Sequence, residues 1–331
     1  MAAIDFHRLS KYIPQFKNKK IAVLGDLMID QYTWGTIQRI SPEAPVPIVE
    51  VQNQSNSLGG AANVANNLQS LGVEVIPTGV IGDDDEGQEL INMITDAGFT
   101  KDGIFIDGTR RTTIKTRIIA HNQHVVRIDR ESKNNISPKT ARLILEFLES
   151  EMPKLDALIL EDYNKGLLTR NLIREVIALA HKNDVITTVD PKFNHFLDYK
   201  GVTLFKPNRK ETEEATAQII HNIDDCVTAA ISLRNKLQCE NILITLGEEG
   251  MVLVDKNDQF TQIPTQAKKV HDVSGAGDTV ISTLTACLTA GASIFEAAHM
   301  ANFAASIVIA EIGAVPIDPQ KLQHVILEQK S

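Results

Sequence analysis

The sequence DVSGAGDT at Asp272–Thr279 leads directly into the apolar, helix-like run Val280–Ala290. The small residues Gly275, Ala276 and Gly277 leave the backbone N–H groups unobstructed, so that these groups can converge on an anion. A helix that begins here adds the positive end of its dipole and its unpaired N–H donors. The stretch therefore predicts a phosphate-binding loop whose geometry also suits a transferring phosphoryl group.

Asp278 lies within the first turn of this expected helix. An aspartate in that position can cap the helix, which is worth about 0.5–2 kcal/mol. It can equally act as a general base beside the phosphate and accept the proton of a hydroxyl group. The motif lacks the spacing of both a Walker A loop and GxGxxG, so the loop by itself leaves both interpretations open.

Outside this loop, short β-branched runs alternate with helix-like stretches. The strand-like runs are Ile21–Leu24, Val73–Ile76, Ala157–Leu160, Val185–Val189, Ile242–Thr245 and Met251–Val254. The helix-like stretches include Ala61–Leu71, Asp84–Ala97, Pro138–Glu151, Leu172–Lys182, Asp224–Leu237 and Ala276–Ala290. This alternation predicts an α/β fold with a mostly parallel sheet covered on both faces. Ligands of such sheets bind beyond the carboxyl ends of the strands.

Two segments break this alternation. Residues 31–52 contain the proline-rich SPEAPVPIVEV, which is typical of an edge strand, and residues 112–129 alternate without a helical stripe. We interpret the regions of about 31–52 and 108–130 as a small projecting β-sheet that forms a lid or a subunit contact. Edge hairpins of the main sheet are the alternative. Since neither an internal repeat nor a low-complexity linker is present, we expect one domain over residues 1–331.

Composition narrows the class of protein. With 331 residues and 43% hydrophobic content, the chain can bury one large core. A net charge of −9 argues against nucleic acid as the main partner, while leaving room for a local basic pocket. The three cysteines form no CxxC pair, which suits a reducing compartment. The polar N-terminus has no signal-peptide core, and no apolar run approaches the roughly 18 residues of a membrane span. We therefore expect a cytoplasmic protein with no membrane partner.

DVSGAGDT resembles the carboxyl-terminal signature of the ribokinase (PfkB) family, usually written D-T-x-G-A-G-D. Further family elements follow in order: GDLMID at Gly25–Asp30, GGAANVANNLQSLG from Gly59, IGDDDEG at Ile81–Gly87, KPNRKE at Lys206–Glu211 and TLGEEG at Thr245–Gly250. Because these matches extend over nearly the whole chain, the sequence is identified as a member of this family. The resemblance implies a ribokinase-like three-layer sandwich with a mostly parallel central sheet and a small projecting β-sheet lid.

The family resemblance also implies an ATP-dependent carbohydrate kinase. Asp278 would be its catalytic base, and the loop Gly275–Gly277, with Ala276 between the glycines, would hold the γ-phosphoryl group. Asn208 and Glu211 would organise Mg²⁺ and the phosphates through bound water. An amide and a carboxylate three residues apart face the same side of a helical turn, and Mg²⁺ prefers oxygen ligands. A helix start of the capping-box kind after Pro207 is the plainer interpretation, and it is compatible with that role.

By the same resemblance, Thr245–Gly250 forms a turn beneath the nucleotide. Thr245 would lie at the strand end, and Gly247 and Gly250 supply the freedom to bend the turn. Asn302 is a weaker nucleotide candidate, since its run AHMANFAASIVIA could be wholly a core helix. The family often carries a monovalent-cation site beside the anion loop. A K⁺ ion would be held here by Asp272, Ser274 and Gly313.

For the sugar, Asp30 matches the family's substrate-binding aspartate. A carboxylate suits neighbouring hydroxyl groups because it accepts two donated hydrogen bonds. Gly59, Gly60 and Asn63 match the loop that contacts further hydroxyl groups. Without the family context, Asn63 would be interpreted as a surface helix residue.

Sequence segments in addition to the general family motifs indicate which sugar is the substrate. They are GDLMIDQYTWG, ISPEAPVPIVEV, TTIKTRIIA, RIDRE, EDYNKG and DPK. This set resembles the D-glycero-β-D-manno-heptose-7-phosphate kinases of lipopolysaccharide-core synthesis, which implies phosphorylation of the anomeric hydroxyl. Arg110, Arg111, Lys115 and Arg117 crowd the expected lid, and Lys165 and Lys192 follow strand ends. An anionic 7-phosphate needs such partners. We assign the substrate phosphate to Arg117, Lys165 and Lys192, with Arg117 and Lys165 first, although each cation could equally belong to a solvated edge.

Many proteins of this group continue into an adenylyltransferase domain with an HxGH-type motif. That motif is absent here, so we expect a stand-alone kinase or a kinase-only fragment. A homodimer through the lid strands is a family-level expectation. The alternatives are a kinase for fructose phosphate, ribose or a nucleoside, and a nucleotide-binding regulator without catalysis. A dehydrogenase is disfavoured because no GxGxxG follows the first strand.

Overall fold

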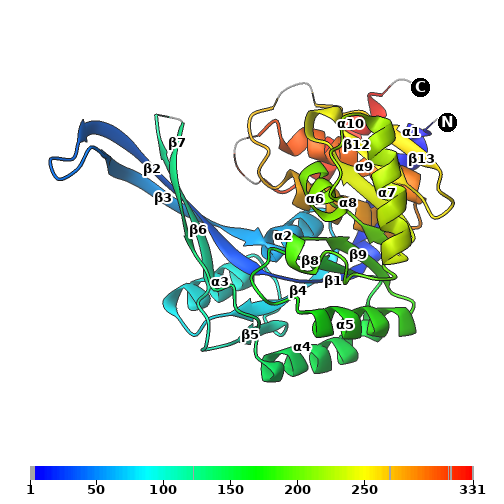
Figure 1. Ribbon diagram of the computed structural model, residues 1–331, viewed down its shortest axis with the longest axis horizontal. Coiled ribbons are helices and arrows are strands. Elements are labelled where there is room, and N and C mark those ends of the chain that lie inside the picture. The colour runs from blue at the N-terminus through cyan, green and yellow to red at the C-terminus, as the bar shows by residue number, and fades with distance from the viewer. Residues whose placement is uncertain (1–3, 122, 268–269, 312, 314, 330–331) are drawn as a thin grey trace.

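The computed structural model describes residues 4–121, 123–267, 270–311, 313 and 315–329. Within these ranges, a nine-stranded sheet divides the body of the protein in the order β13-β12-β11-β10-β9-β8-β1-β4-β5 (Figure 1). Its strands are β1 (Lys20–Gly25), β4 (Glu74–Ile81), β5 (Ile104–Ile106), β8 (Ala157–Glu161), β9 (Ile186–Asp190), β10 (Leu204–Phe205), β11 (Asn241–Thr245), β12 (Met251–Val254) and β13 (Phe260–Ile263). All pairs are parallel except β11–β12 and β12–β13, which are antiparallel.

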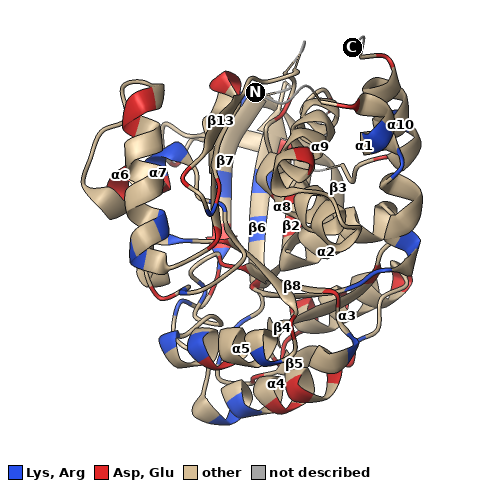
Figure 2. Ribbon diagram, turned by 90° about the vertical axis from the view of Figure 1, so that its right-hand side faces the viewer, with Lys and Arg blue, Asp and Glu red and all other residues tan. Residues whose placement is uncertain are grey.

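Helices cover both faces of this sheet. One layer contains α1 (Phe6–Ser10), α2 (Ala61–Ser70), α3 (Asp85–Asp96), α8 (Ala276–Thr289), α9 (Ile294–Val308) and α10 (Pro319–Leu327). The other contains α4 (Pro138–Glu151), α5 (Arg170–Lys182), α6 (Arg209–Thr216) and α7 (Ile223–Leu237). Short 3₁₀ turns are η1 (Ile13–Asn18), η2 (Met152–Lys154), η3 (Phe193–His195) and η4 (Gly247–Glu249). Figure 2 shows α4 and α5 on one side of β8, with α2, α8 and α9 on the other.

The central strands are apolar on both sides because each side meets a helical layer. In β1, Ile21 and Val23 pack into the first core, whereas Ala22 and Leu24 pack into the second. β8 is buried at every position. The predicted α/β sandwich with its mostly parallel sheet is therefore confirmed, and burial on both faces explains the continuous apolar runs.

A second sheet, called the lid sheet below, projects from this body with the strand order β3-β2-β6-β7 (Figure 1). Its strands are β2 (Leu27–Ile40), β3 (Pro47–Gly60), β6 (Thr113–Ala120) and β7 (Gln123–Arg130). The expectation of a small separate sheet is confirmed, and these strands are not edge hairpins of the main sheet. Since only Asp26 separates β1 from β2, the lid sheet grows directly out of the carboxyl end of a central strand.

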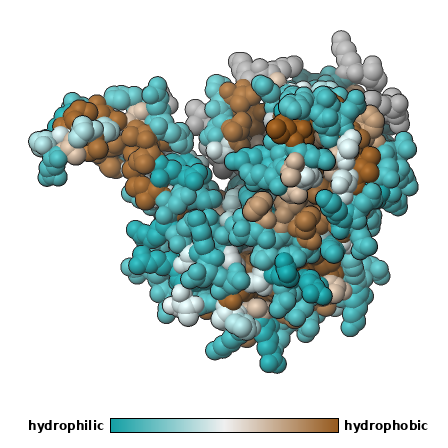
Figure 3. All heavy atoms as spheres, viewed as in Figure 1, coloured by the Kyte–Doolittle hydropathy of each residue, from teal (hydrophilic) through white to brown (hydrophobic). Residues whose placement is uncertain are grey.

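The lid strands extend further towards the body than the sequence pattern indicated. β2 begins at Leu27 and β3 ends at Gly60, so both reach beyond the segment 31–52, and β6 begins only at Thr113. Figure 3 shows apolar surface on this projection. Large apolar side chains there are about half exposed or more, including Ile40, Val46, Val51, Val126 and Ile128.

All six strand-like runs form strands, and all six helix-like stretches form helices with small shifts at their ends. The sequence pattern missed β5, β10 and β13, which contain three, two and four residues. Such short strands cannot show a period of two. No helix within the described ranges is both long enough and apolar enough to cross a bilayer.

Candidate active site

The predicted anion loop turns into α8 at the carboxyl ends of the central strands. Gly275 is the N-cap of α8 and has φ 77°, a left-handed conformation that favours glycine. Asp278 follows in the first turn, and no side chain caps this helix. The Asp278 carboxylate instead accepts hydrogen bonds from Asn63 Nδ2 at 2.6 Å and from the Tyr163 hydroxyl at 3.0 Å. It therefore faces away from its own helix end and towards α2 and the loop after β8.

The surroundings of Asp278 change its proton affinity. Its side chain is buried, and burial together with the nearby Asp190 raises its pKa to about 6. Hydrogen bonds from Asn63 and Tyr163 and the charge of Lys206 oppose this rise. A carboxylate with a pKa close to neutrality is ionised at pH 7 and is a better proton acceptor than an ordinary aspartate.

Two more buried carboxylates lie beside Asp278. Glu161 ends β8, Asp190 ends β9, and the two are register partners. One carboxylate oxygen from each of Glu161, Asp190 and Asp278 lies within 4.8 Å of the others. The buried Lys206 pairs with Asp190 at 2.7 Å. This oxygen-rich cluster suits a hard divalent cation, which such carboxylates bind.

Glu161 is the least satisfied member of this cluster. Its Oε2 is buried and has no hydrogen-bond partner among the described residues. Burial raises the pKa of Glu161 well above its ordinary value, and the charges of Asp190 and Asp278 add to this shift. The carboxyl group is thus poised to donate or accept a hydrogen bond, or to bind a cation, once a ligand enters.

A cavity of about 110 Å³, called the inner cavity below, opens beside Asp278. It is lined by Met28, Asp30, Gly60, Asn63, Lys115, Arg117, Tyr163, Ser274, Gly275 and Asp278. The structure thus brings four residues predicted to bind substrate, Asp30, Gly60, Asn63 and Arg117, together with the predicted base. These residues come from four separate segments of the chain.

The paired glycines allow the backbone to approach closely here. A Cβ atom at Gly59 would lie 2.7 Å from Asp30 Oδ2. A Cβ atom at Gly60, which has φ 57°, would lie 2.4 Å from the carbonyl oxygen of Asp26. Both distances are too short for a side chain, so glycine at these positions allows β3 to close against β2 at the cavity wall.

The three cations predicted to hold the substrate phosphate all have acidic partners. Arg117 pairs with Asp30 and lies over the Tyr32 ring, with 5.3 Å between its guanidinium carbon and the ring centroid. Lys165 pairs with Glu131, and Lys192 pairs with Glu211. Only Arg117 lines the inner cavity, whereas Lys165 and Lys192 lie outside its lining. Their assignment to the substrate phosphate stays a prediction.

A larger cleft of about 650 Å³, the outer cleft, lies on the other side of the anion loop. Thr245, Gly247, Gly250 and Asn302, the residues predicted to bind nucleotide, all line it together with Ala276 and Gly277. Its apolar walls include Met251, Val273, Val280, Ala305 and Ile309. The N-terminus of α8 thus separates two spaces, one with apolar walls suited to a base and one with polar walls.

Asn302 has a structural contact that its sequence context left open. It lies buried in α9, and its Nδ2 donates to the carbonyl oxygen of Pro264 at 2.8 Å. Gly250 has φ 89°, and a Cβ atom there would lie 2.1 Å from the carbonyl oxygen of Ile263. Both residues therefore hold the segment after β13 against the floor of the outer cleft.

Asn208 and Glu211 form the capping box of α6. The Glu211 N–H donates to Asn208 Oδ1 and the Asn208 N–H donates to Glu211 Oε2, each at 2.9 Å. Glu211 also pairs with Lys192. An isolated bridge with Thr245 places Asn208 beside the outer cleft. The helix-start interpretation therefore describes their contacts, and the water-mediated role at Mg²⁺ stays a prediction.

The three residues predicted to bind a monovalent cation lie together. The Asp272 carboxylate accepts hydrogen bonds from the N–H groups of Ser274 at 2.8 Å and Gly313 at 3.2 Å. Burial opposes its ionisation, but these donors prevail and lower its pKa. Asp272 therefore stays charged and can still offer a lone pair to a cation.

Sequence reasoning assigned no role to several residues of the site. They are Asp26, Glu161, Tyr163, Asp190 and Lys206, whereas Lys115 is one of the cations that the sequence places in the lid as partners for an anionic phosphate. Tyr163 bonds Asp278, and Asp26 accepts hydrogen bonds from the N–H groups of Tyr163 at 2.9 Å and Lys165 at 3.0 Å. Asp26, Glu161 and Asp190 each stand at or just after the end of a central strand. Ligands bind beyond these ends, and this rule could have identified all three.

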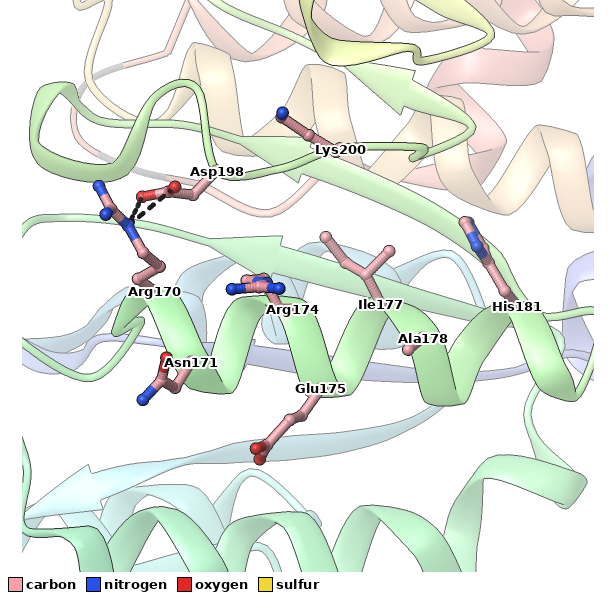
Figure 4. A pocket seen from close by; sticks show the side chains of 9 residues that line it. All are labelled: Arg170, Asn171, Arg174, Glu175, Ile177, Ala178, His181, Asp198 and Lys200. Carbon is pink, nitrogen blue, oxygen red and sulfur yellow. Dashed lines mark hydrogen bonds and ion pairs between the residues drawn. The ribbon is translucent and has the colours of Figure 1, made fainter.

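A groove of about 990 Å³ is larger than either of these spaces, and it lies along α5 (Figure 4). Arg170, Arg174 and His181 from α5 face Asp198 and Lys200 across it, and Arg170 pairs with Asp198 at 3.0 Å. None of the predicted site residues lines this groove. The candidate site residues therefore gather at the strand ends and not in this larger groove.

The family model described as "pfkB family carbohydrate kinase" matches residues 18–321. The chain belongs to this family. Membership confirms the prediction of a carbohydrate kinase made from DVSGAGDT and its accompanying motifs.

Similar PfkB sequences include the "Bifunctional protein HldE" of Pelobacter propionicus, 41% identical over 98% of this chain. The same-named protein of Desulfatibacillum aliphaticivorans is 43% identical over 95% of the chain. The chain spans 66% and 64% of the lengths of these two relatives.

Solved PfkB structures share the fold at low sequence identity. Arabidopsis thaliana ribokinase complexed with ribose and ATP superposes with a TM-score of 0.74 at 17% identity, over 94% of this chain and 99% of its own. Escherichia coli phosphofructokinase-2 in complex with potassium gives a TM-score of 0.76 at 19% identity, over the same 94% and 99%. These likenesses confirm the ribokinase-like architecture.

Proposed function

We propose that this chain transfers the γ-phosphoryl group of ATP to the anomeric hydroxyl of D-glycero-β-D-manno-heptose 7-phosphate. The product would be heptose 1,7-bisphosphate, an intermediate on the way to ADP-heptose and the lipopolysaccharide core. The observation that carries the proposal is the inner cavity, where the buried carboxylate of Asp278 and two cations, Lys115 and Arg117, line one space. Identity of 41–43% to bifunctional HldE proteins over nearly the whole chain supports the choice of sugar.

In the proposed reaction, Asp278 takes the proton of the sugar hydroxyl as that oxygen attacks the γ-phosphorus. The new O–P bond forms while the bond from phosphorus to the β,γ-bridging oxygen breaks, and ADP leaves with the electron pair. Backbone N–H groups from Gly275 to Gly277 at the start of α8 stabilise the charge on the equatorial oxygens. Asn63 and Tyr163 orient the Asp278 carboxylate towards the inner cavity.

Mg²⁺ and K⁺ fit the residues that surround this loop. Asn208 and Glu211 would hold Mg²⁺ through water, with Glu161 and Asp190 close to the same region. Asp272, Ser274 and Gly313 would hold K⁺. The divalent ion would neutralise phosphate charge, which lowers the cost of bringing two anionic substrates together.

We also propose a cytoplasmic location and a homodimer formed through the lid sheet. The dimer is supported by the exposed apolar side chains of the lid sheet, which include Ile40, Val46, Val51, Val126 and Ile128. Contiguous apolar surface of this kind is a feature of protein interfaces.

The proposed function is tested by measuring ADP formation from ATP and Mg²⁺ against a panel of sugars. The panel holds heptose 7-phosphate, unphosphorylated heptose, fructose 6-phosphate and ribose. We expect kcat/KM for heptose 7-phosphate to exceed that of every other sugar by at least about tenfold, which is about 1.4 kcal/mol of transition-state stabilisation. Preference for another sugar would contradict the substrate, and no turnover on any sugar would contradict catalysis.

A further inference from the structure

Lys115 is the cation of the inner cavity whose charge has no acidic partner. It lies on β6, is partly buried, and lines the cavity together with Asp278. No acidic side chain within the described ranges comes within ion-pair distance of its ammonium group. Its Nζ lies 4.6 Å from the centroid of the Tyr163 ring, whose hydroxyl bonds the base.

Strand register explains why Lys115 has no partner. Lys115 lies opposite Asp30 on β2 and opposite Asp129 on β7, so a carboxylate flanks it on each side. Both carboxylates are paired with arginines that lie two positions further along the strands, on the same face of the sheet. Arg117 pairs with Asp30, and Arg127 binds Asp129 through two hydrogen bonds of 2.8 and 3.0 Å. Figure 2 shows blue bands of Lys and Arg on β6 and β7.

Holding an ammonium group in this position costs free energy. Burial lowers the pKa of Lys115, and the like charges of Lys165 and Arg117 lower it further, against the attraction of Asp30 and Asp129. A partly buried cation without a counter-charge destabilises the ligand-free protein. Such a cost is typical of a binding site whose counter-charge arrives with the ligand.

We propose that Lys115 binds the phosphate group of the sugar phosphate and thereby selects a phosphorylated over an unphosphorylated sugar. Lys115 reaches the inner cavity from β6 of the lid sheet, whereas Gly275 and Asp278 line the same cavity from the start of α8. The lid-sheet side of the cavity therefore receives the substrate's own phosphate, while the α8 side receives the γ-phosphoryl group. The cation–π contact with Tyr163 keeps the ammonium in the cavity.

This inference rests on the proposed kinase activity towards a sugar phosphate. It places Lys115 ahead of Arg117 and Lys165 as the cation that binds the substrate phosphate. Arg117 and Lys165 are already neutralised by Asp30 and Glu131. As members of ion pairs they shape the site without adding net positive charge to it. Lys115 supplies the unpaired positive charge that a phosphate dianion requires.

The test compares wild type, Lys115→Met and Lys115→Arg on heptose 7-phosphate and on unphosphorylated heptose. We expect Lys115→Met to raise KM for the phosphorylated sugar by about 10- to 100-fold, the usual effect of losing one charged hydrogen bond. The ratio of kcat/KM for the phosphorylated sugar to kcat/KM for the free sugar should fall by a similar factor, while the KM for ATP stays within about twofold. Lys115→Arg should restore part of the preference. Lys256→Met, which removes an exposed lysine in the turn between β12 and β13, is the charge-matched control.

Thermal unfolding separates binding from folding. Because Lys115→Met removes an unpaired charge, its Tm should equal or exceed that of wild type. Three results with a folded variant would overturn the role of Lys115. The variant could keep the wild-type preference for the phosphorylated sugar, lose activity on both sugars equally, or lose affinity for ATP instead. If the wild-type protein turns over sugars with and without the 7-phosphate equally well, the proposed substrate is wrong, and the assignment of Lys115 is wrong with it.

Discussion

Asp278 carries a negative charge in a buried position, next to Glu161 and Asp190. Its raised pKa has two consequences, one for catalysis and one for stability. With a pKa of about 6, Asp278 exists mainly as the carboxylate at pH 7, as its proposed role as a general base requires. The same burial makes ionisation of this group unfavourable for the folded state.

Replacing Asp278 by asparagine should therefore lower activity and raise stability. We expect kcat to fall by about 10²–10⁴-fold, the usual scale of losing a general base, with little change in KM for ATP. In the wild type, kcat/KM should fall below pH 6 as the carboxylate is protonated. Steady-state kinetics from pH 5 to pH 8 measure both effects, and near-normal turnover of Asp278→Asn would remove this residue from the role.

The stability effect of the same variant depends on pH. The pKa of Asp278 is raised in the folded protein from 3.8 to about 6, so its ionisation penalises folding above pH 6. Asp278→Asn should raise the free energy of unfolding by about 1–3 kcal/mol at pH 7.5. This gain should shrink as pH falls through 6 and vanish below 4. Denaturant unfolding at three pH values tests it, with Asp96→Asn at the exposed end of α3 as the control.

The loop after β8 is an element whose position depends on one carboxylate. Asp26, which directly follows β1, accepts hydrogen bonds through its Oδ2 from the N–H groups of Tyr163 and Lys165. Arg110 reinforces this loop by donating to the carbonyl oxygen of Lys165. Since Tyr163 in turn bonds Asp278, the end of one central strand positions this proposed base through the loop that follows the neighbouring strand.

Replacing Asp26 by alanine should release this loop. Two N–H groups would lose their acceptor, and small displacements near a reacting group can cost up to about 10²-fold. We expect kcat/KM to fall by about 10- to 100-fold in Asp26→Ala and by much less in Asp26→Asn, which keeps an acceptor oxygen. Hydrogen exchange of the Tyr163 and Lys165 amides provides a structural measurement. Unchanged protection in Asp26→Ala would show that Asp26 does not hold the loop.

At the scale of the whole molecule, the lid sheet combines residues of the inner cavity with exposed apolar side chains. One of its faces carries Asp30, Lys115 and Arg117 into the inner cavity. Val126 and Ile128 on β7 remain about half exposed, at 49% and 52%. A sheet that closes a cavity with one face and pairs with a second copy elsewhere would couple the oligomeric state to substrate binding.

If the lid sheet forms a dimer, a charge on its apolar surface should disrupt it. We expect the double change Val126→Asp with Ile128→Asp to yield a monomer at micromolar concentration, because burying an unpaired carboxylate is strongly unfavourable. Multi-angle light scattering after gel filtration gives the mass directly. Ile106→Asp on β5, where the side chain is 59% exposed outside the lid sheet, is the matched control. A double variant that keeps the wild-type mass would refute this interface.

The α/β class, the mostly parallel sheet, the separate lid sheet and the anion loop could all be predicted from the sequence. These features depend on local patterns. Continuous apolar runs, alternating segments and a glycine-rich turn ahead of an apolar helix each follow from the chemistry of neighbouring residues. The order of the family motifs then predicted the type of kinase, which the family comparison confirms.

Only the tertiary structure decided which charges are already paired. From the sequence, the substrate phosphate is assigned to Arg117, Lys165 and Lys192 ahead of Lys115. Contacts with Asp30, Glu131 and Glu211 leave Lys115 alone unpaired among these four. It also decided that Asn63, Tyr163 and Asp278 meet, although 215 positions separate Asn63 from Asp278. Pairing and burial depend on long-range contacts between strand ends, which no local period encodes, and these contacts set both the proton affinity of the base and the free charge of the cavity.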